Sequence, residues 1–346
     1  MSGIFEQHFD PLAGTHGKSG DLRRFLVTFG LFGFFQAVIL ITCVVIFFSY
    51  PRGNDPSAWG VEKRMRLTIT PGPRLVLMGD SSLVLGLNST ALEEAFPAYN
   101  PVNAGLYAFL GQRVMLNEVE DLVRPGDVVV ISWAYAHFAR NEIANLYYHY
   151  AVQRPESILH FRSEEIAWFL DSCSYMIKEA MKRSKKVLMG SERAAFGPPY
   201  GRDSLNRYGD GVGHYGMESP PGMTPDIKPL TITPNGYTGG IIDYLNDVNA
   251  KLEARGAKVL FAYPPITETS YEDNREALDL LDQTLRTRLD FPVINRPDEM
   301  FFPRDQFYDT AYHLKEPSVY DRSDRLVESL RPYLTDQPEK SGEAQP

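Results

Sequence analysis

One apolar run stands apart from the rest of the chain in its length. Residues 25–50 read FLVTFGLFGFFQAVILITCVVIFFSY, contain no charge and follow Arg23-Arg24. About 20 apolar residues are enough to cross the hydrocarbon core of a bilayer, and a helix satisfies its own backbone hydrogen bonds there. The alternative is a cleaved signal peptide, whose apolar region is shorter and ends in small residues. The pattern favours an uncleaved transmembrane signal anchor over residues 23–50.

The charges beside this run indicate its orientation. Cationic residues lie on both sides of it: Lys18, Arg23 and Arg24 before it, and Arg52, Lys63, Arg64 and Arg66 after it. Counting them does not choose between the two orientations, but the arginine pair directly beside the first apolar residue favours a cytoplasmic N-terminus. Residues 1–22 are then a loose cytoplasmic tail, and the rest of the chain lies outside the cytoplasm.

Beyond residue 73, continuous apolar segments alternate with amphipathic ones. The apolar segments predict buried strands at 74–79, 128–133, 258–263 and, shorter, 291–295. The amphipathic segments predict helices at 90–96, 110–123, 163–183, 239–255, 273–288 and 317–333. Such alternation is typical of a parallel sheet covered on both faces. We therefore expect an α/β domain over residues 74–334, with its layers in the order α/β/α.

The segments without periodicity complete the expected organisation. Residues 51–73 are rich in Pro, Gly and charge and predict a linker, and residues 335–346 predict a polar, disordered tail. Residues 190–238 are rich in Gly and Pro but also contain aromatic residues. Long aperiodic segments within a domain are usually functional loops or disordered ones. We interpret 190–238 as an insertion that partly covers a site, with a mobile surface loop as the alternative.

Composition narrows the possible partners and cofactors. The 346 residues carry a formal net charge of −9, which argues against a nucleic-acid partner because a phosphate-binding surface needs excess Lys and Arg. The two cysteines, Cys43 and Cys173, cannot build a disulfide framework or a zinc cluster. We expect no metal and no cofactor.

The first predicted strand leads into a turn that suits a catalytic nucleophile. Leu75-Val76-Leu77-Met78 is followed by Gly79-Asp80-Ser81. In α/β enzymes a strand that ends in a glycine turn presents a serine hydroxyl at the carboxyl edge of the sheet, where ligands bind. The alternative is a Gly-Asp-Ser turn with no catalytic role, because such tripeptides are common in loops.

A catalytic serine needs a base, and the base needs an acid that fixes its tautomer. Of the seven histidines, His313 follows the last predicted strand and has Asp309 four residues before it. We expect packing or surface roles for His137, His149, His160 and His214, while His8 and His16 precede the membrane segment. The alternative for His313 is a surface loop with an incidental acid. Separation of Ser81 Oγ, His313 and Asp309 well beyond about 4 Å would count against a triad.

The order of these motifs resembles the SGNH (GDSL-type) hydrolase superfamily. Gly79-Asp80-Ser81 matches its first block, Asn103-Ala104-Gly105 its second, and Asp309 to His313 its last. The resemblance implies a flavodoxin-like α/β/α fold, Ser81 as nucleophile, His313 as base and Asp309 as acid. It also implies an oxyanion hole made by the backbone amides of Gly105 and Ser81, with Asp80 and Asn103 as possible pocket residues.

Two departures from the family pattern qualify the resemblance. The family's last block usually places Asp three residues before His, where this chain has Thr310. The family's third block usually supplies an oxyanion-hole asparagine, whereas here the strand leads into Trp133-Ala134-Tyr135 and the first asparagine is Asn141. Tyr135 is a possible substitute, or an aromatic packing residue. Tyr263 ends a strand at the same edge and either lines the pocket or terminates the strand.

The membrane segment indicates a location and a substrate class. The layout is similar to that of membrane-tethered SGNH proteins of bacterial envelope polysaccharide pathways. The resemblance implies a single-pass inner-membrane protein whose periplasmic domain moves or removes O-acyl groups on a glycan, with acetyl as the expected group. It also implies a possible multi-pass acyltransferase or polysaccharide synthase as partner. The alternatives are a lipase or thioesterase acting on acyl chains, and a non-catalytic glycan-binding or scaffold subunit.

Overall fold

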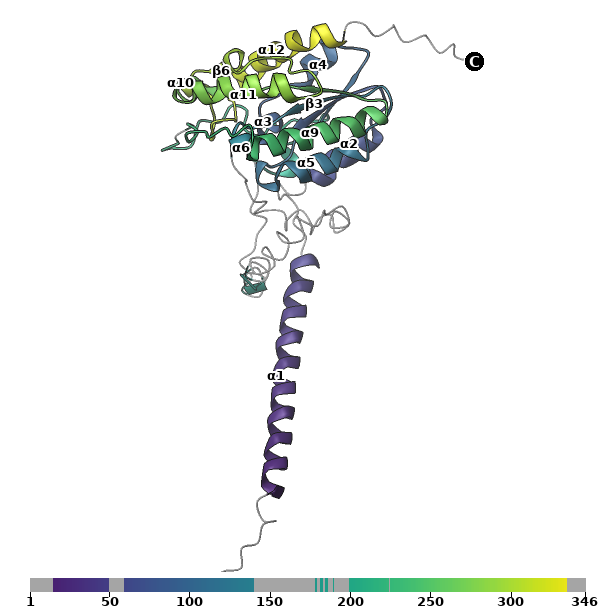
Figure 1. Ribbon diagram of the computed structural model, residues 1–346, viewed down its shortest axis with the longest axis vertical. Coiled ribbons are helices and arrows are strands. Elements are labelled where there is room, and N and C mark those ends of the chain that lie inside the picture. The colour runs from purple at the N-terminus through teal and green to yellow at the C-terminus, as the bar shows by residue number, and fades with distance from the viewer. Residues whose placement is uncertain are drawn as a thin grey trace, which may run out of the picture. The chain divides into compact units, whose positions relative to one another are not determined.

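The computed structural model describes residues 15–49, 59–139, 199–223 and 225–334, with six single positions between 178 and 189. The chain divides into two compact units, one with the N-terminal helix and one with the α/β domain (Figure 1). Some predicted segments lie wholly or largely outside the described residues: the helix at 163–183, the tail at 335–346, and His149 and His160.

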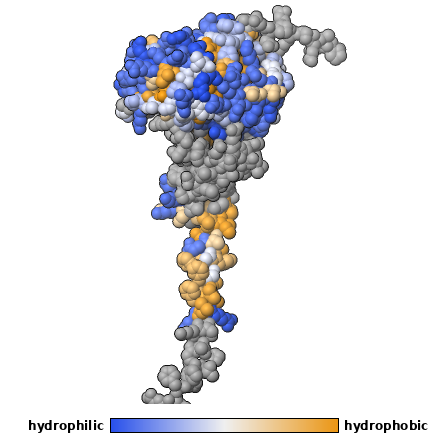
Figure 2. Space-filling model, viewed as in Figure 1, coloured by the Kyte–Doolittle hydropathy of each residue, from blue (hydrophilic) through white to orange (hydrophobic). Residues whose placement is uncertain are grey.

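Helix α1, Thr15–Ser49, is long and apolar enough to cross a membrane over Asp21–Cys43. Its large side chains, such as Phe29 and Ile41, are exposed, and Figure 2 shows mainly hydrophobic residues along this helix with a few hydrophilic ones between them. The helix begins at Thr15, so the prediction of a loose tail is wrong for residues 15–22. Once the first turn of a helix has formed, extending the helix by a further turn costs little free energy, so the apolar helix continues into residues 15–22.

Residues 59–69 are part of the folded domain, and the prediction of a linker there is wrong. They form helix α2, Trp59–Ile69. This helix packs against helix α5, Gln112–Glu120, and strand β2, Asn100–Asn103. Trp59, Lys63 and Leu67 lie four residues apart and are all buried, so they form one face of the helix. Charged residues interrupt this face in the sequence, and only the packing partners reveal it.

Four parallel strands form the main sheet of the described domain, in the order β2-β1-β3-β4. They are β1 (Arg74–Gly79), β2 (Asn100–Asn103), β3 (Val128–Ser132) and β4 (Lys258–Phe261). In the register, Gly79 at the end of β1 pairs with Ser132 at the end of β3. Because the strands are parallel, the loops that follow them meet at one carboxyl edge.

Alternate side chains of the strands enter two separate hydrophobic clusters. Val76 and Val129 belong to the cluster that includes side chains of α2, α5 and α9. Leu77 and Val130 belong to the cluster that includes side chains of α4 and α12. Figure 1 shows α5 and α9 together on one side of the domain and α4 with α12 on the other. The α/β architecture is therefore present, with helices against both faces of the sheet.

The predicted helices are present with small shifts of their ends. Their bounds are α4 Ser89–Ala95, α5 Gln112–Glu120, α9 Tyr237–Ala254, α11 Arg275–Arg288 and α12 Glu316–Leu334. The predicted helix at 273–288 corresponds to α11, and α10 (Glu268–Asp273) before it was not predicted. Asn274 lies between the two helices as the C-cap of α10, and its backbone carbonyl accepts the N–H of Leu278.

The strands differ more from the prediction. Strand β2 was missed because it has few apolar residues and contains Pro101, which an edge strand tolerates. The predicted strand at 291–295 is wrong: only Val293 forms a bridge, to Phe261. A second, two-stranded sheet pairs β5 (Ile266–Thr267) with β6 (Phe301–Phe302).

Candidate active site

The turn after β1 is fixed by close packing and by a helix cap. A Cβ atom on Gly79 would lie 1.9 Å from the carbonyl oxygen of Ser132, so no other residue fits without moving the strands. Asp80 follows as the N-cap of helix α3, Ser81–Val84, and its Oδ1 accepts the amide of Ser82 at 2.8 Å. Ser81 therefore occupies the first position of α3, at the carboxyl edge of the sheet.

The structure brings the three predicted catalytic side chains together. His313 Nε2 lies 2.9 Å from Ser81 Oγ, and His313 Nδ1 lies 2.7 Å from Asp309 Oδ1. Ser81 and His313 are 232 residues apart in the chain. If Nδ1 carries the proton, Asp309 accepts it and Nε2 is left as the acceptor for the serine hydroxyl. This is the arrangement that activates a serine nucleophile.

The four-residue spacing of Asp309 and His313 does not prevent their hydrogen bond. Thr310 Oγ1 accepts the amides of Tyr312 and His313, both at 3.2 Å. This side-chain turn folds the segment back on itself, and the carbonyl of His313 accepts the amide of Tyr308 at 2.8 Å. Thr310 therefore helps to fold the loop that carries Asp309 and His313.

Asp80 lies beneath the serine and does not line a pocket, contrary to the prediction. It is 1% exposed, its Oδ2 accepts the amide of Ala134 at 2.6 Å, and His137 Nε2 lies 3.2 Å away. Burial alone would raise the pKa of this carboxyl. The His137 side chain, the Ala134 amide and the Ser82 side chain together outweigh burial and lower the pKa of Asp80 below its usual value. Asp80 is thus an ionised anchor between β1 and β3.

His137 has a packing role, as predicted for it. It is fully buried, and its ring lies beside that of Trp133. Its contact with Asp80 was not foreseen, because the two residues belong to different βα loops.

Asn103 is completely buried, so its prediction as a pocket residue is also wrong. Its Oδ1 accepts Lys63 Nζ at 3.3 Å and the Gly105 amide at 3.0 Å. Its Nδ2 donates to the Leu83 carbonyl at 2.9 Å and to Asp210 Oδ1 at 2.8 Å. The side chain therefore uses both its donor hydrogens and both its acceptor positions.

The Gly105 amide donates to the side chain of Asn103. Ala104 and Leu106 continue the β2 ladder by donating to Leu77 and Gly79. A Cβ on Gly105 would lie 3.0 Å from the Asp80 carbonyl oxygen, which shows how closely this loop approaches the nucleophile turn. The Gly105 N–H points to Asn103 Oδ1, and the oxyanion role of this amide stays a prediction. The Ser81 amide belongs to the first turn of α3, whose amides have no partner within the helix.

Tyr135 and Tyr263 pack against each other in the core. They are 0% and 2% exposed, and their rings stack with centroids 5.7 Å apart. The Tyr135 hydroxyl donates to the Pro264 carbonyl at 3.2 Å. The predictions of Tyr135 as a substitute oxyanion donor and of Tyr263 as a pocket residue are therefore wrong, because both side chains are enclosed.

Arg322 of α12 holds the other end of α3 and was not foreseen. It is 2% exposed and donates to the carbonyls of Ser82 and Gly86, the latter at 3.0 Å. Burial lowers its pKa to about 10, and the charge of Asp80 opposes that shift. Nothing in the sequence links an arginine in the last helix to the turn after the first strand.

The described part of the predicted insertion, 199–223 and 225–238, packs beside the site. The ring of Tyr200 lies 6.3 Å from that of His313. His214 is 2% exposed, and its Nε2 lies 2.9 Å from the Leu314 carbonyl oxygen, so the ring donates there. Burial lowers the pKa of His214 to about 4, so the ring is neutral. These contacts contradict a mobile surface loop for this part, and whether the insertion covers the site stays a prediction.

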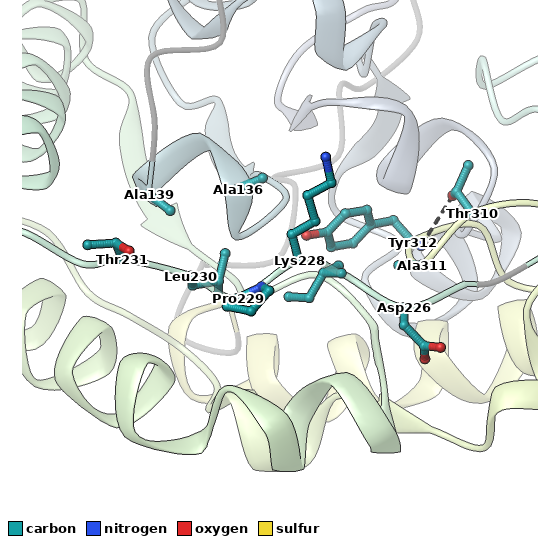
Figure 3. A pocket seen from close by; sticks show the side chains of 11 residues that line it. Ala136, Ala139, Asp226, Lys228, Pro229, Leu230, Thr231, Thr310, Ala311 and Tyr312 are labelled. Carbon is teal, nitrogen blue, oxygen red and sulfur yellow. Dashed lines mark hydrogen bonds between the residues drawn. The ribbon is translucent and has the colours of Figure 1, made fainter.

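A cavity of about 410 Å³ lies beside the loop that carries His313. It is bounded by α6 (Ala136–Ala139), by residues 226–231 and by residues 310–312. Figure 3 shows the side chains of Lys228 and Tyr312 close to each other among the residues that line this cavity. The 226–231 wall is held by α10, since Ser270 Oγ accepts the Ile227 amide and Asn274 Oδ1 accepts the Leu230 amide. The cavity therefore has fixed walls that share a loop with His313.

Within the described part of the chain, no group of three or more His, Cys, Asp or Glu side chains is placed to hold a metal ion.

A scan against protein-family models and a search of curated proteins each returned no match. The arrangement of Ser81, His313 and Asp309 is thus the basis for assigning a chemistry.

Proposed function

We propose that the chain is an SGNH-type enzyme with a three-layer α/β/α domain that transfers or hydrolyses O-acyl groups. The observation that carries the proposal is the hydrogen-bonded series from Ser81 Oγ through His313 to Asp309 Oδ1. The β2-β1-β3-β4 parallel sheet, with the nucleophile directly after β1, supports the fold assignment.

In the first step Ser81 Oγ attacks the carbonyl carbon of an ester. The serine proton passes to His313 Nε2, and Asp309 stabilises the imidazolium through Nδ1–H. The tetrahedral intermediate collapses when its bond to the alcohol breaks, and His313 returns the proton to the leaving alkoxide. The products are the free alcohol and an acyl ester on Ser81.

The oxyanion of this intermediate needs hydrogen-bond donors in place before reaction. The Ser81 amide is one proposed donor. The Gly105 amide is the second, and to serve it has to turn from Asn103 Oδ1 toward the substrate or share its hydrogen between them. The residues directly after β3, Trp133-Ala134-Tyr135, include no asparagine, so the proposal relies on the two backbone donors.

In the second step a hydroxyl group attacks the acyl ester with His313 as base. Water as acceptor gives hydrolysis, and a sugar hydroxyl gives transfer. We propose a glycan as substrate because the aromatic ring of Tyr200 lies beside His313 and an amphipathic ring suits the apolar face of a sugar. The cavity beside residues 310–312 is the proposed seat for part of this substrate, within the usual size range of ligand sites.

Helix α1 supports a membrane location for this reaction. With the N-terminus inside, the domain acts on the outer side of the bacterial inner membrane, on an envelope polysaccharide. A multi-pass acyltransferase or polysaccharide synthase is the proposed partner, since a glycan acylated outside the cytoplasm requires an acyl donor from across the membrane.

Labelling with a fluorophosphonate probe tests the nucleophile directly, because the probe forms a covalent bond with an activated serine. The detergent-solubilised full chain should be labelled, and Ser81→Ala should not be. Ser82→Ala is the matched control and should retain labelling, since Ser82 is buried. His313→Ala should slow both labelling and 4-nitrophenyl acetate hydrolysis by at least about 100-fold.

The same assay separates the alternatives. Preference for long-chain over acetyl esters favours a lipase or thioesterase. Labelling that persists in Ser81→Ala contradicts Ser81 as the nucleophile. A folded wild-type chain that is neither labelled nor hydrolytic contradicts the catalytic proposal and favours a glycan-binding subunit. Thermal melting of each variant shows whether lost labelling reflects lost folding.

A further inference from the structure

A lysine is buried beneath the candidate active site. Lys63 of α2 is 2% exposed, although burying an ammonium group is costly unless it is hydrogen-bonded and paired. Its Nζ donates to the Gly209 carbonyl at 2.6 Å and to Asn103 Oδ1 at 3.3 Å. An apolar side chain of similar size would fill this space without the cost of a buried charge. The charge therefore needs an explanation beyond packing.

Asn103 lies between this lysine and a buried carboxylate. Its Oδ1 faces Lys63, and its Nδ2 donates to Asp210 Oδ1 at 2.8 Å. Asp210 is fully buried and is held by the amide and hydroxyl of Ser89 and by Asn206 Nδ2. The negative end of the amide dipole points to the cation and the positive end to the anion. This charge pair opposes a flip of the Asn103 side chain.

The remaining bonds of Asn103 reach both sides of the candidate site. Nδ2 donates to the carbonyl of Leu83, two residues after Ser81 in α3. Oδ1 accepts the amide of Gly105, the proposed oxyanion donor. One side chain thus sets the distance between the nucleophile's helix and the Gly105 loop. A shift of about 1 Å in such a constellation can cost around 100-fold in rate.

Resting on the function proposed above, we propose that Lys63 is a positioning residue for acyl transfer. By holding Asn103 Oδ1, Lys63 fixes the orientation of the Asn103 amide, and Asn103 in turn holds Gly105 and α3 in register around Ser81 Oγ. Lys63 does not contact substrate, and it acts through Asn103.

The protonation state of Lys63 makes this role sensitive to pH. Burial lowers the pKa of Lys63 to about 7, the charge of Asp210 opposes that shift, and Arg66 adds to it. Above neutral pH the amine keeps two N–H donors but loses the charge that orients Asn103. We therefore expect catalysis to fall as Lys63 loses its proton.

The other charged groups around α2 face its arginines rather than Lys63. Glu62 pairs with Arg66 and Arg202, while Glu118 and Asp121 of α5 pair with Arg64.

The test compares Lys63→Met, Lys63→Arg and the matched control Arg64→Met, one residue along the same helix. The assay is 4-nitrophenyl acetate hydrolysis by the full chain in detergent from pH 6 to 9.5. Active sites are counted by fluorophosphonate titration, and melting temperatures are measured in parallel. Lys63→Met should lower kcat per active site about 10- to 100-fold at pH 6.5 with little change in KM. It should also remove the alkaline fall of the wild-type profile.

Lys63→Arg keeps a charge at all these pH values, so it should restore part of kcat without an alkaline fall near pH 7. Arg64→Met should follow the wild-type profile. Wild-type kcat and an unchanged pH profile in Lys63→Met would overturn the inference, as would a loss explained entirely by fewer titratable sites. If hydrolysis does not depend on Ser81, the proposed function itself fails, and that result is separate.

Discussion

At the scale of single residues, the candidate site combines reactive side chains that keep a little solvent exposure with supports that have almost none. Ser81, His313 and Asp309 carry the proposed reaction, and sequence motifs identified all three. Their supports are buried: Asp80, beneath the serine, and Arg322, on the last helix. A motif can name a reactive residue because its type and spacing are constrained by chemistry. A buried residue that holds the reactive ones in place is constrained by geometry alone. Many residue types at many positions in the chain could therefore fill that role.

His214 is one such support, and its burial predicts how stability depends on pH. Its pKa is about 4 in the folded chain and about 6.5 when unfolded. Between these values the unfolded state binds more protons, so the free energy of unfolding falls as pH drops from 6.5 to 4. The loss is about 3 kcal/mol, from 1.36 kcal/mol per pKa unit. Denaturant unfolding at pH 7, 5.5 and 4.5 measures it.

The matched variant is His214→Gln, which keeps a donor for the Leu314 carbonyl but does not titrate. Its unfolding free energy should fall less over the same interval, because the carboxylates that also titrate there are common to both proteins. Parallel curves for the two proteins would show that His214 is not the group responsible.

At the scale of elements, α2 differs most from the sequence-based expectation. Its segment has the composition of a polar linker, yet the helix contributes Trp59 and Leu67 to the core and Lys63 to the network around Asn103. The buried face of α2 consists of Trp59, Lys63 and Leu67, which lie four residues apart. Because a lysine lies in its middle, the face has no distinct apolar stripe in the sequence. The strand that α2 contacts, β2, was missed for a related reason, since its edge position removes the need for a continuous apolar run.

If α2 belongs to the domain, replacing its buried tryptophan must destabilise the whole domain. Trp59→Ala should lower the free energy of unfolding by about 3–5 kcal/mol. Val61→Ala, on the exposed side of the same helix, should change it by less than about 0.5 kcal/mol. Near-UV circular dichroism during thermal unfolding measures both. Equal and small effects would place α2 outside the cooperative unit.

At the scale of the whole molecule, one chain contains a helix long and apolar enough to cross a membrane and an α/β domain. The orientation of that helix decides which compartment holds Ser81. The cationic residues nearest to the apolar span carry most of the orienting effect. Among those described, Arg23 and Arg24 lie at the N-terminal end of the span.

A dual reporter fused after residue 346 tests this orientation in bacteria. Alkaline phosphatase is active only outside the cytoplasm. Green fluorescent protein fluoresces in the cytoplasm and stays dark when it is exported in unfolded form. The wild-type fusion should be phosphatase-active and dark. Replacing both Arg23 and Arg24 with Asn should produce a mixed population, because the bias is reduced. Lys18→Asn, farther from the span, is the control. A fluorescent wild-type fusion would contradict the proposed location.

The sequence by itself determined the features that depend on local chemistry and periodicity. It located the long apolar helix, strands β1, β3 and β4, most helices around them, and the three residues of the proposed triad. Each of these has a signature in neighbouring positions: a run, a period or a motif.

The tertiary structure alone decided which residues support the site. It placed Asn103, Tyr135 and Tyr263 in the interior instead of in a pocket, and it directed the Gly105 amide to Asn103. It also joined Lys63 to Asn103 across 40 residues and Arg322 to Ser82 across 240. Contacts between distant segments depend on how helices pack on the sheet. A buried polar group satisfies its hydrogen bonds with whichever partner that packing brings near.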